Sequence, residues 1–368
     1  MSPTPQQVKA ALSELKLAAR KEPKLAFSGC LGLLERLGTH GSEYDEVLTS
    51  IATWLPQVLK RSKPAADELS DWQERLYQAL SRNPERLGAL ADQWGRFCLN
   101  KTSALRWAER IRKELNGEWR PPHLVAAYLR CLLPAERYAE LLEALDELPN
   151  PSWEERLLGV TALAAGGDPD AAVRYAETHG TLKSPTAVAQ ACEKVLIDAG
   201  RKDEAYARYA LRAGEASTYV AWFRAVRKKY PARSPESILA DLVAATPEEP
   251  GKWFAAAKDA KLFKEAIALV ERSQADVRTL LRAAHDYGEK EPWFAMEAGL
   301  AALRWMLEAP HFEITNTEIW NAYNATRVAA NAADRRDEAM DRLRELLGRD
   351  SVRDRVVTRV LSRELGLS

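Results

Sequence analysis

The fold class follows from two short stretches, Gly200-Arg201-Lys202-Asp203-Glu204-Ala205 and Asp334-Arg335-Arg336-Asp337-Glu338-Ala339. Each stretch predicts a tight turn with a few polar residues, followed by an acidic residue and an alanine near the start of a helix. Variants of the same phrase lead to Ala171 and Ala266. The four alanines lie 34, 61 and 73 residues apart, close to one, two and two units of about 34 residues. This spacing predicts repeated helix pairs that share a continuous core.

Helix signals extend along the whole chain, and no run alternates apolar and polar residues as a half-buried strand would. Helix starts are marked by a capping side chain before proline or by capping-box spacing. Examples are Asp168-Pro169, Ser234-Pro235, Thr246-Pro247, Ser70 with Gln73, Ser152 with Glu155, and Thr315 with Glu318. We therefore expect an all-α protein, an α-solenoid of stacked antiparallel helix pairs.

The predicted helices fall into two groups along the chain. The first group covers 5–20, 24–37, 43–61, 65–81, 84–99, 103–115, 121–132 and 134–147. The second includes 152–165, 169–179, 186–199, 203–213, 252–260 and 316–332. The first group is poorly periodic, so we expect an N-terminal helical region at 1–150, either degenerate repeats or a bundle, and helical repeats at 151–368. Leu148-Pro149-Asn150-Pro151 is the best boundary, and it is too short to be a flexible linker.

The two turn stretches quoted above resemble the inter-helix turn of tetratricopeptide repeats. The segment from Tyr230 to Leu346 also resembles uncharacterised bacterial helical-repeat domains. Its resemblance rests on Tyr230-Pro231, Gly251-Lys252-Trp253-Phe254 and Ala298-Gly299-Leu300-Ala301-Ala302-Leu303-Arg304-Trp305. The resemblance implies a tetratricopeptide-like solenoid in a bacterial protein, and it implies no particular activity. The tryptophan, leucine-glycine and tyrosine positions of a consensus first helix do not recur regularly.

Composition sets limits on the partner and the compartment. The 368 residues are 46% hydrophobic and 29% charged, with 53 basic and 53 acidic side chains. A balanced net charge draws the chain neither to nucleic acid nor to an acidic membrane, so a charged partner would bind a local patch. No stretch of about 18 apolar residues predicts a membrane span, and the polar segment at 1–21 lacks the apolar run of a secretory signal. We expect a cytoplasmic protein that does not bind membranes.

The sequence patterns around the cysteines, histidines and tryptophans predict structural roles for them. Cys30, Cys98, Cys131 and Cys192 each lie on an apolar helix face and form no CxxC pair. The five histidines, His40, His123, His179, His285 and His311, make no metal-binding motif. His285 shares a stripe with Leu281 and Ala284, which favours a core or edge position. The eleven tryptophans mostly have apolar neighbours at helical spacing, so we expect core packing, with one or two on a binding face.

Motifs that carry catalysis do not occur in this sequence. It contains no phosphate-binding glycine loop, no dinucleotide fingerprint and no nucleophile elbow. The glycines mostly fall where helices end. We therefore predict no catalytic residues, no cofactor and no metal site.

The most specific surface feature is the basic stretch from Arg201 to Arg233, which has nine basic residues and three acidic ones. Tyr219, Trp222, Phe223 and Val226 form an apolar stripe within it that should face the core. The candidate partner-binding residues lie on a different face of the same helix: Arg224, Arg227, Lys228 and Lys229. They form either an ordinary solvated helix face or a ridge for phosphate or an acidic peptide.

Three functions remain open at the level of sequence. The first is a non-catalytic protein-interaction scaffold, in which the first helices of each pair hold a segment of another protein or a peptide. The second is a nucleic-acid-associated protein that uses the basic ridge at 201–233. The third is an enzyme that lacks a recognisable motif. We expect the scaffold, because repeat architecture is present and catalytic motifs are not.

Overall fold

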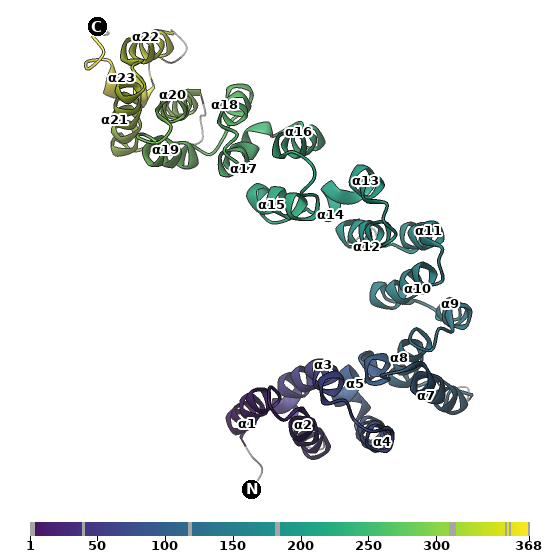
Figure 1. Cartoon of the computed structure of the whole chain (residues 1–368). Coiled ribbons are helices and arrows are strands. Elements are labelled where there is room, and N and C mark those ends of the chain that lie inside the picture. The colour runs from purple at the N-terminus through teal and green to yellow at the C-terminus, as the bar shows by residue number, and fades with distance from the viewer. Residues whose placement is uncertain are drawn as a thin grey trace. The chain divides into compact units, whose positions relative to one another are not determined.

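The computed structural model describes residues 4–38, 41–116, 120–180, 185–308, 314–349, 352 and 355–366, and these residues form helices joined by turns (Figure 1). No strand occurs among them, so the predicted all-α fold class is confirmed. The chain divides into two compact units, Met1–Lys202 and Asp203–Ser368. None of the described helices is long and apolar enough to cross a membrane.

The first unit is built from helices that contact their next and next-but-one neighbours along the chain, such as α2 with α3 and α4, and α10 with α11 and α12. Its elements are α1 (Pro5–Ala18), α2 (Pro23–Leu37), η1 (Ser42–Tyr44), α3 (Asp45–Ser62), α4 (Ala66–Arg82), α5 (Pro84–Asp92), α6 (Trp94–Phe97), α7 (Lys101–Glu114), α8 (Pro122–Leu132), α9 (Tyr138–Asp146), α10 (Trp153–Ala165), α11 (Pro169–His179) and α12 (Pro185–Asp198).

The second unit follows the same local plan. Its elements are α13 (Lys202–Ala205, which begins one residue before the unit), η2 (Tyr206–Ala210, a π-helical turn), α14 (Leu211–Ala213), α15 (Tyr219–Lys229), α16 (Pro235–Ala245), η3 (Pro250–Trp253), α17 (Phe254–Asp259), α18 (Phe263–Arg272), α19 (Val277–Asp286), α20 (Pro292–Glu308), α21 (Asn316–Ala332), α22 (Arg336–Leu347) and α23 (Val356–Leu361). Within this unit α15, α17 and α19 lie on one side and α16, α18 and α20 on the other (Figure 1). Contacts also join α15 to α17, α19 to α21, and α18 to α20.

One turn geometry recurs between successive helices in both units. The left-handed residues are Glu136 (φ 57°), Gly167 (φ 90°), Gly200 (φ 78°), Lys261 (φ 61°) and Asp334 (φ 56°). In every case the next residue donates its N–H to a carbonyl five positions earlier, as Arg201 does to Leu196 at 2.8 Å. This pattern satisfies carbonyls that the end of a helix leaves unpaired. The repeated phrase in the sequence therefore corresponds to a repeated backbone turn.

A buried small or apolar side chain follows each left-handed residue by five positions. These side chains are Leu141, Ala172, Ala205, Ala266 and Ala339, all 0% exposed. The spacing of the turn stretches had placed Ala171 in this set, and that assignment was wrong by one residue. Counting from the left-handed Gly167 selects Ala172 instead, and Ala171 is only partly buried. The turn at Glu136 extends the pattern into the region that had looked poorly periodic.

Several predicted helix boundaries need correction. The expected helix at 84–99 is broken at Gln93 into α5 and α6, and α9 begins at Tyr138 because the turn at Glu136 precedes it. Thr246 ends α16 rather than starting a helix, since its hydroxyl donates to the Leu242 carbonyl at 2.9 Å. Capping by Asp168, Ser152, Ser234 and Thr315 is confirmed.

The spacing of Ser70 and Gln73 is not a capping box, because both residues lie inside α4. Gln73 is 1% exposed and joins three helices. Its Oε1 accepts from Trp107 Nε1 at 2.9 Å, and its Nε2 donates to the Phe97 carbonyl at 2.8 Å. Ser103 Oγ lies 2.9 Å from the same Nε2. These bonds satisfy polar groups that are buried beside the aromatic core of the first unit.

The expected joint at Leu148-Pro149-Asn150-Pro151 lies inside the first unit. Helices α9 and α10 contact each other across it, and Ala162 of α10 belongs to the core that begins at Val8. The boundary between the two compact units falls in the sequence between Lys202 and Asp203. A two-proline turn ends a helix without separating the packing on its two sides, because the flanking helices still share their apolar faces.

All four cysteines are buried, as expected for structural thiols. Burial raises the pKa of the Cys30 thiol to about 12. Burial, with a hydrogen bond to Cys98, also raises the pKa of Cys131. A raised pKa keeps a thiol protonated and unreactive. Most described tryptophans are buried or partly buried, Trp320 is 36% exposed, and Trp119 lies outside the described residues.

Candidate functional site

The four predicted partner-binding cations lie on the last two turns of α15. Thr218 caps this helix by accepting a hydrogen bond from the Ala221 N–H at 3.2 Å. Phe223 and Val226 are buried, and the expectation that their stripe faces the core is confirmed. The exposed residues are Arg224, Arg227, Lys228 and Lys229. Basic side chains suit this end of a helix, because the backbone dipole places partial negative charge there.

Arg224 is engaged within the protein. Its Nε and Nη2 both donate to the carboxylate of Asp259 in α17, with an Nε–Oδ2 distance of 2.8 Å. The hydrogen bond from Arg224 lowers the pKa of Asp259, and the charges of Lys258 and Arg227 lower it further. One carboxylate thus lies among three cations. The Asp259 carboxylate links α17 to α15, and it neutralises only one of the three neighbouring positive charges.

Other cations of the basic stretch are balanced by its own three carboxylates and by Asp170 outside it. The pairs are Arg201 with Asp170 (2.8 Å), Arg208 with Glu204 (2.9 Å), Arg212 with Glu215 (3.2 Å) and Arg233 with Asp203 (3.3 Å). Arg233 also lies over the ring of Tyr206, 3.8 Å from its centre. The excess of basic residues in the sequence therefore overstates the charge that this surface offers to a partner.

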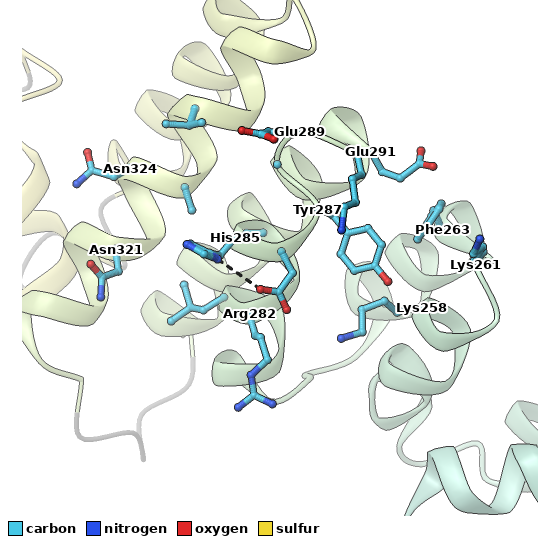
Figure 2. A pocket seen from close by; sticks show the side chains of 17 residues that line it. Lys258, Lys261, Phe263, Arg282, His285, Tyr287, Glu289, Glu291, Asn321 and Asn324 are labelled. Carbon is cyan, nitrogen blue, oxygen red and sulfur yellow. Dashed lines mark hydrogen bonds and ion pairs between the residues drawn. The ribbon is translucent and has the colours of Figure 1, made fainter.

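A cavity of about 1460 Å³ lies in the second unit, and sequence reasoning did not find it. It is lined from α17 to α21, and Figure 2 shows its side chains. Arg282 and His285 come from α19, and Asn321 and Asn324 come from α21. Lys258 and Lys261 lie at the end of α17 and in the turn that follows. The walls therefore come mainly from α17, α19 and α21, with Phe263 of α18 and the loop between α19 and α20.

Local patterning explains why polar groups point into this cavity. In α19, Leu280, Ala283 and Ala284 are buried, which leaves Arg282 and His285 on the exposed side. In α21 the residues Asn321, Asn324 and Val328 follow i, i+3, i+7 spacing on the exposed face. Val328 is 55% exposed, unusual for so apolar a side chain. This exposed stripe is the one sequence signal that could have revealed the cavity.

His285 is not a core residue, although its apolar stripe had favoured a core or edge position. Its side chain is 86% exposed at the edge of the cavity, and its Nδ1 lies 3.4 Å from Asp286 Oδ1 (Figure 2). Burial lowers the pKa of His123 and of His179. His40 and His311 lie outside the described residues. Among described residues, no group of three or more His, Cys, Asp or Glu side chains is arranged to hold a metal ion.

Most of the charged side chains that line the cavity, of both signs, form no ion pair with another described residue. The cations are Lys258, Lys261, Arg282 and Lys290, and none of them forms an ion pair with a described residue. The carboxylates are Asp286, which lies beside His285, and Glu289 and Glu291, which form no ion pair with a described residue either. Cations that line a cavity without an ion pair can bind the anionic groups of a ligand. Cations that already form an ion pair within the protein would first have to give up that partner.

A second, smaller cavity shows the opposite arrangement. It measures about 350 Å³ and is lined by α18, α20 and α22. Arg342 grips the carboxylate of Glu297 through two bonds of 2.6 Å and 2.9 Å, and the Glu297 side chain is 9% exposed. Arg304 and Arg349 both approach Glu308. Since the three arginines here are already paired with carboxylates, we interpret this cavity as part of the packing between helices.

Comparison with protein-family models gave no match for this sequence, and comparison with curated proteins found none that is significantly similar.

Proposed function

We propose that the protein is a non-catalytic interaction scaffold of the helical-repeat type. In this proposal the helices form an α-solenoid of antiparallel pairs, and the first helices of successive pairs hold a segment of another protein. The recurrent turn and its buried residue five positions later support the repeat architecture. Four reduced, buried cysteines suit a reducing compartment such as the bacterial cytoplasm.

The observation that carries the proposal is the cavity formed by α17, α19 and α21. Its volume of about 1460 Å³ exceeds the few hundred to about 1,000 Å³ of small-molecule sites. Three consecutive leading helices contribute to it, as expected if neighbouring repeats share one binding surface. A site of this size and origin suits a length of polypeptide better than a compact metabolite.

The arrangement of polar groups also favours binding over catalysis. His285 and Asp286 form the cavity's one close acid–base pair among the described residues. No serine, threonine or cysteine is among the described residues that line the cavity beside this pair. A nucleophile within hydrogen-bonding reach is what such a pair would need to activate.

A blocking substitution tests the proposal directly. Asn324 is exposed and lines the cavity, so Asn324→Trp places a bulky ring in it. Asn331 is exposed on the same helix and does not line the cavity, so Asn331→Trp is the matched control. The tagged wild type and both variants would be used for affinity capture from native lysate, with and without nuclease, followed by mass spectrometry.

We expect a near-stoichiometric protein partner with the wild type and with Asn331→Trp, and loss of that partner with Asn324→Trp. Nuclease should change nothing. A partner that Asn324→Trp still retains would show that the cavity is not the binding surface. Capture that nuclease abolishes would favour the alternative in which the basic ridge at 201–233 binds nucleic acid.

A further inference from the structure

We infer that the partner segment held in this cavity is an acidic, extended peptide with an apolar residue among its carboxylates. The inference rests on the proposed function and adds the chemistry of the partner. It follows from three properties of the cavity: cations without ion pairs, two neighbouring asparagines on α21, and apolar side chains that remain accessible to a ligand.

Charge complementarity indicates an anionic ligand. Lys258, Lys261, Arg282 and Lys290 line the cavity without ion pairs to described residues. Of the cavity's carboxylates, Asp286 lies beside His285. The positive surface continues onto α15, because Arg227 and Lys258 both act on the single carboxylate of Asp259. Four lysine and arginine side chains thus line the cavity against three carboxylates, and Arg227 lies near by, so a chain of zero formal net charge carries a small local excess of positive charge here that favours an acidic partner.

A peptide fits this surface better than a nucleic acid does. Asn321 and Asn324 are exposed on one face of α21, and each amide can both donate and accept hydrogen bonds. Their spacing places the side chains about 5–6 Å apart, close to the roughly 6.6 Å between alternate residues of an extended chain. A peptide backbone carries both N–H and C=O groups, so it can bond both the oxygen and the nitrogen of each asparagine amide. The phosphate oxygens of a nucleic acid only accept hydrogen bonds, so they use the amide nitrogen alone.

Two carboxylates at the rim add to the discrimination. Glu289 and Glu291 belong to the loop between α19 and α20 and both line the cavity, with their carboxylates pointing in different directions (Figure 2). A nucleic-acid strand carries a negative charge at every phosphate, so it would meet these carboxylates wherever it crossed the loop. A peptide can place neutral residues there and its acidic residues against the lysines.

The apolar part of the cavity completes the description of the ligand. Val328 is 55% exposed and Phe263 is half-buried, and both line the cavity. Covering such side chains with one apolar residue of a ligand removes them from water, which is favourable in proportion to the area buried. The best ligand therefore carries acidic residues on both sides of a leucine-like side chain.

The experiment is a selection of random dodecamer peptides displayed on phage against the purified full-length protein. We expect enrichment of acidic sequences with a central apolar residue, and loss of that enrichment with Asn324→Trp. A selected dodecamer, labelled with fluorescein, is then titrated by fluorescence anisotropy, with a labelled thymidine dodecamer as the nucleic-acid probe.

Charge reversal and amide removal give the quantitative test. Lys258→Glu with Arg282→Glu should weaken binding of the selected peptide at least about tenfold. The matched reversal Lys264→Glu with Arg272→Glu, at exposed sites of α18 outside the cavity, should leave it within about twofold. Asn321→Ala with Asn324→Ala should weaken it by about three- to tenfold, and Asn331→Ala should not.

The outcomes separate the inference from the proposed function. Enrichment of neutral or basic peptides that still depends on the cavity would support the proposed scaffold function and refute the inference that the partner is acidic. Stronger binding of the thymidine dodecamer, lost on Lys258→Glu with Arg282→Glu, would also overturn it. A selection with no enrichment sensitive to Asn324→Trp would count against both.

Discussion

Replacing Gln73 by leucine should destabilise the first unit strongly, although the two side chains have similar volumes. Gln73 is 1% exposed, so the leucine would fit the space but make no hydrogen bonds. Besides Ser103 Oγ and Arg106, which are less deeply buried, two groups would lose their partner: Trp107 Nε1, which lies 2.9 Å from Gln73 Oε1, and the Phe97 carbonyl, which lies 2.8 Å from Gln73 Nε2. Both aromatic residues are at most 2% exposed, so water cannot replace the lost bonds without disturbing the packing.

The magnitude follows from these two groups. Leaving a buried donor or acceptor unpaired costs about 1–3 kcal/mol each, so two such groups amount to about 2–6 kcal/mol of unfolding free energy. Leucine burial recovers about 1–2 kcal/mol of this, because it is more apolar than the amide. We expect a net loss of about 2–4 kcal/mol, which is large against a total stability of about 5–15 kcal/mol.

Urea unfolding followed by circular dichroism at equilibrium measures this loss. Gln78→Leu is the matched control, since Gln78 is exposed on the same helix and bonds only to Glu74 at 3.3 Å. The control should change the unfolding free energy by less than about 0.5 kcal/mol. If Gln73→Leu costs no more than Gln78→Leu, the bonds to Trp107 and Phe97 do not stabilise this core, and the reasoning fails.

Two further perturbations address the turns and the link between α15 and α17. Gly200→Ala should lower the unfolding free energy by about 1 kcal/mol, because the added Cβ would meet no neighbour and the left-handed backbone is the whole cost. Lys261→Gly should raise the unfolding free energy by up to about 1 kcal/mol, because glycine adopts the left-handed conformation of this residue without that cost. Urea midpoints that move in the same direction for both variants would contradict this reasoning. The ion pair of Asp259 with Arg224 lowers the pKa of Asp259 below its ordinary 3.8, so its small stabilisation is complete above the unfolded-state pKa and disappears as pH falls through the folded-state pKa. The difference in urea midpoint between wild type and Arg224→Ala should therefore shrink from neutral pH to strongly acidic pH, and a difference that grows on acidification would refute the assignment.

Much of the fold was predictable because its signals are local. A capping side chain and a tight turn act within a few residues, so Ser152, Asp168 and the turns at Gly200 and Asp334 could be read directly. The turn at Glu136 escaped notice, because neither a glycine nor an alanine marks it. Backbone geometry accepts a non-glycine residue there at a modest cost.

The candidate site was less predictable, because its properties depend on contacts between distant residues. Exposure of Arg224 followed from helical periodicity, but its partner Asp259 lies 35 residues away in sequence. The cavity draws on residues from Lys258 to Val328, and Asn321 and Asn324 look like ordinary exposed asparagines until α19 and α21 lie side by side. Sequence periodicity assigns a residue to a face, and only packing shows what that face borders.

The placement of the cysteines offers a way to observe the two units separately. Cys30, Cys98, Cys131 and Cys192 all belong to Met1–Lys202, and the sequence from Asp203 onward contains none. Since all four are buried, a thiol reagent modifies the native protein only when the first unit opens. The rate of labelling therefore reports the opening of that unit alone. A single cysteine introduced at an exposed position beyond Asp203 would react at once, and it would attach a probe to the second unit without touching the first.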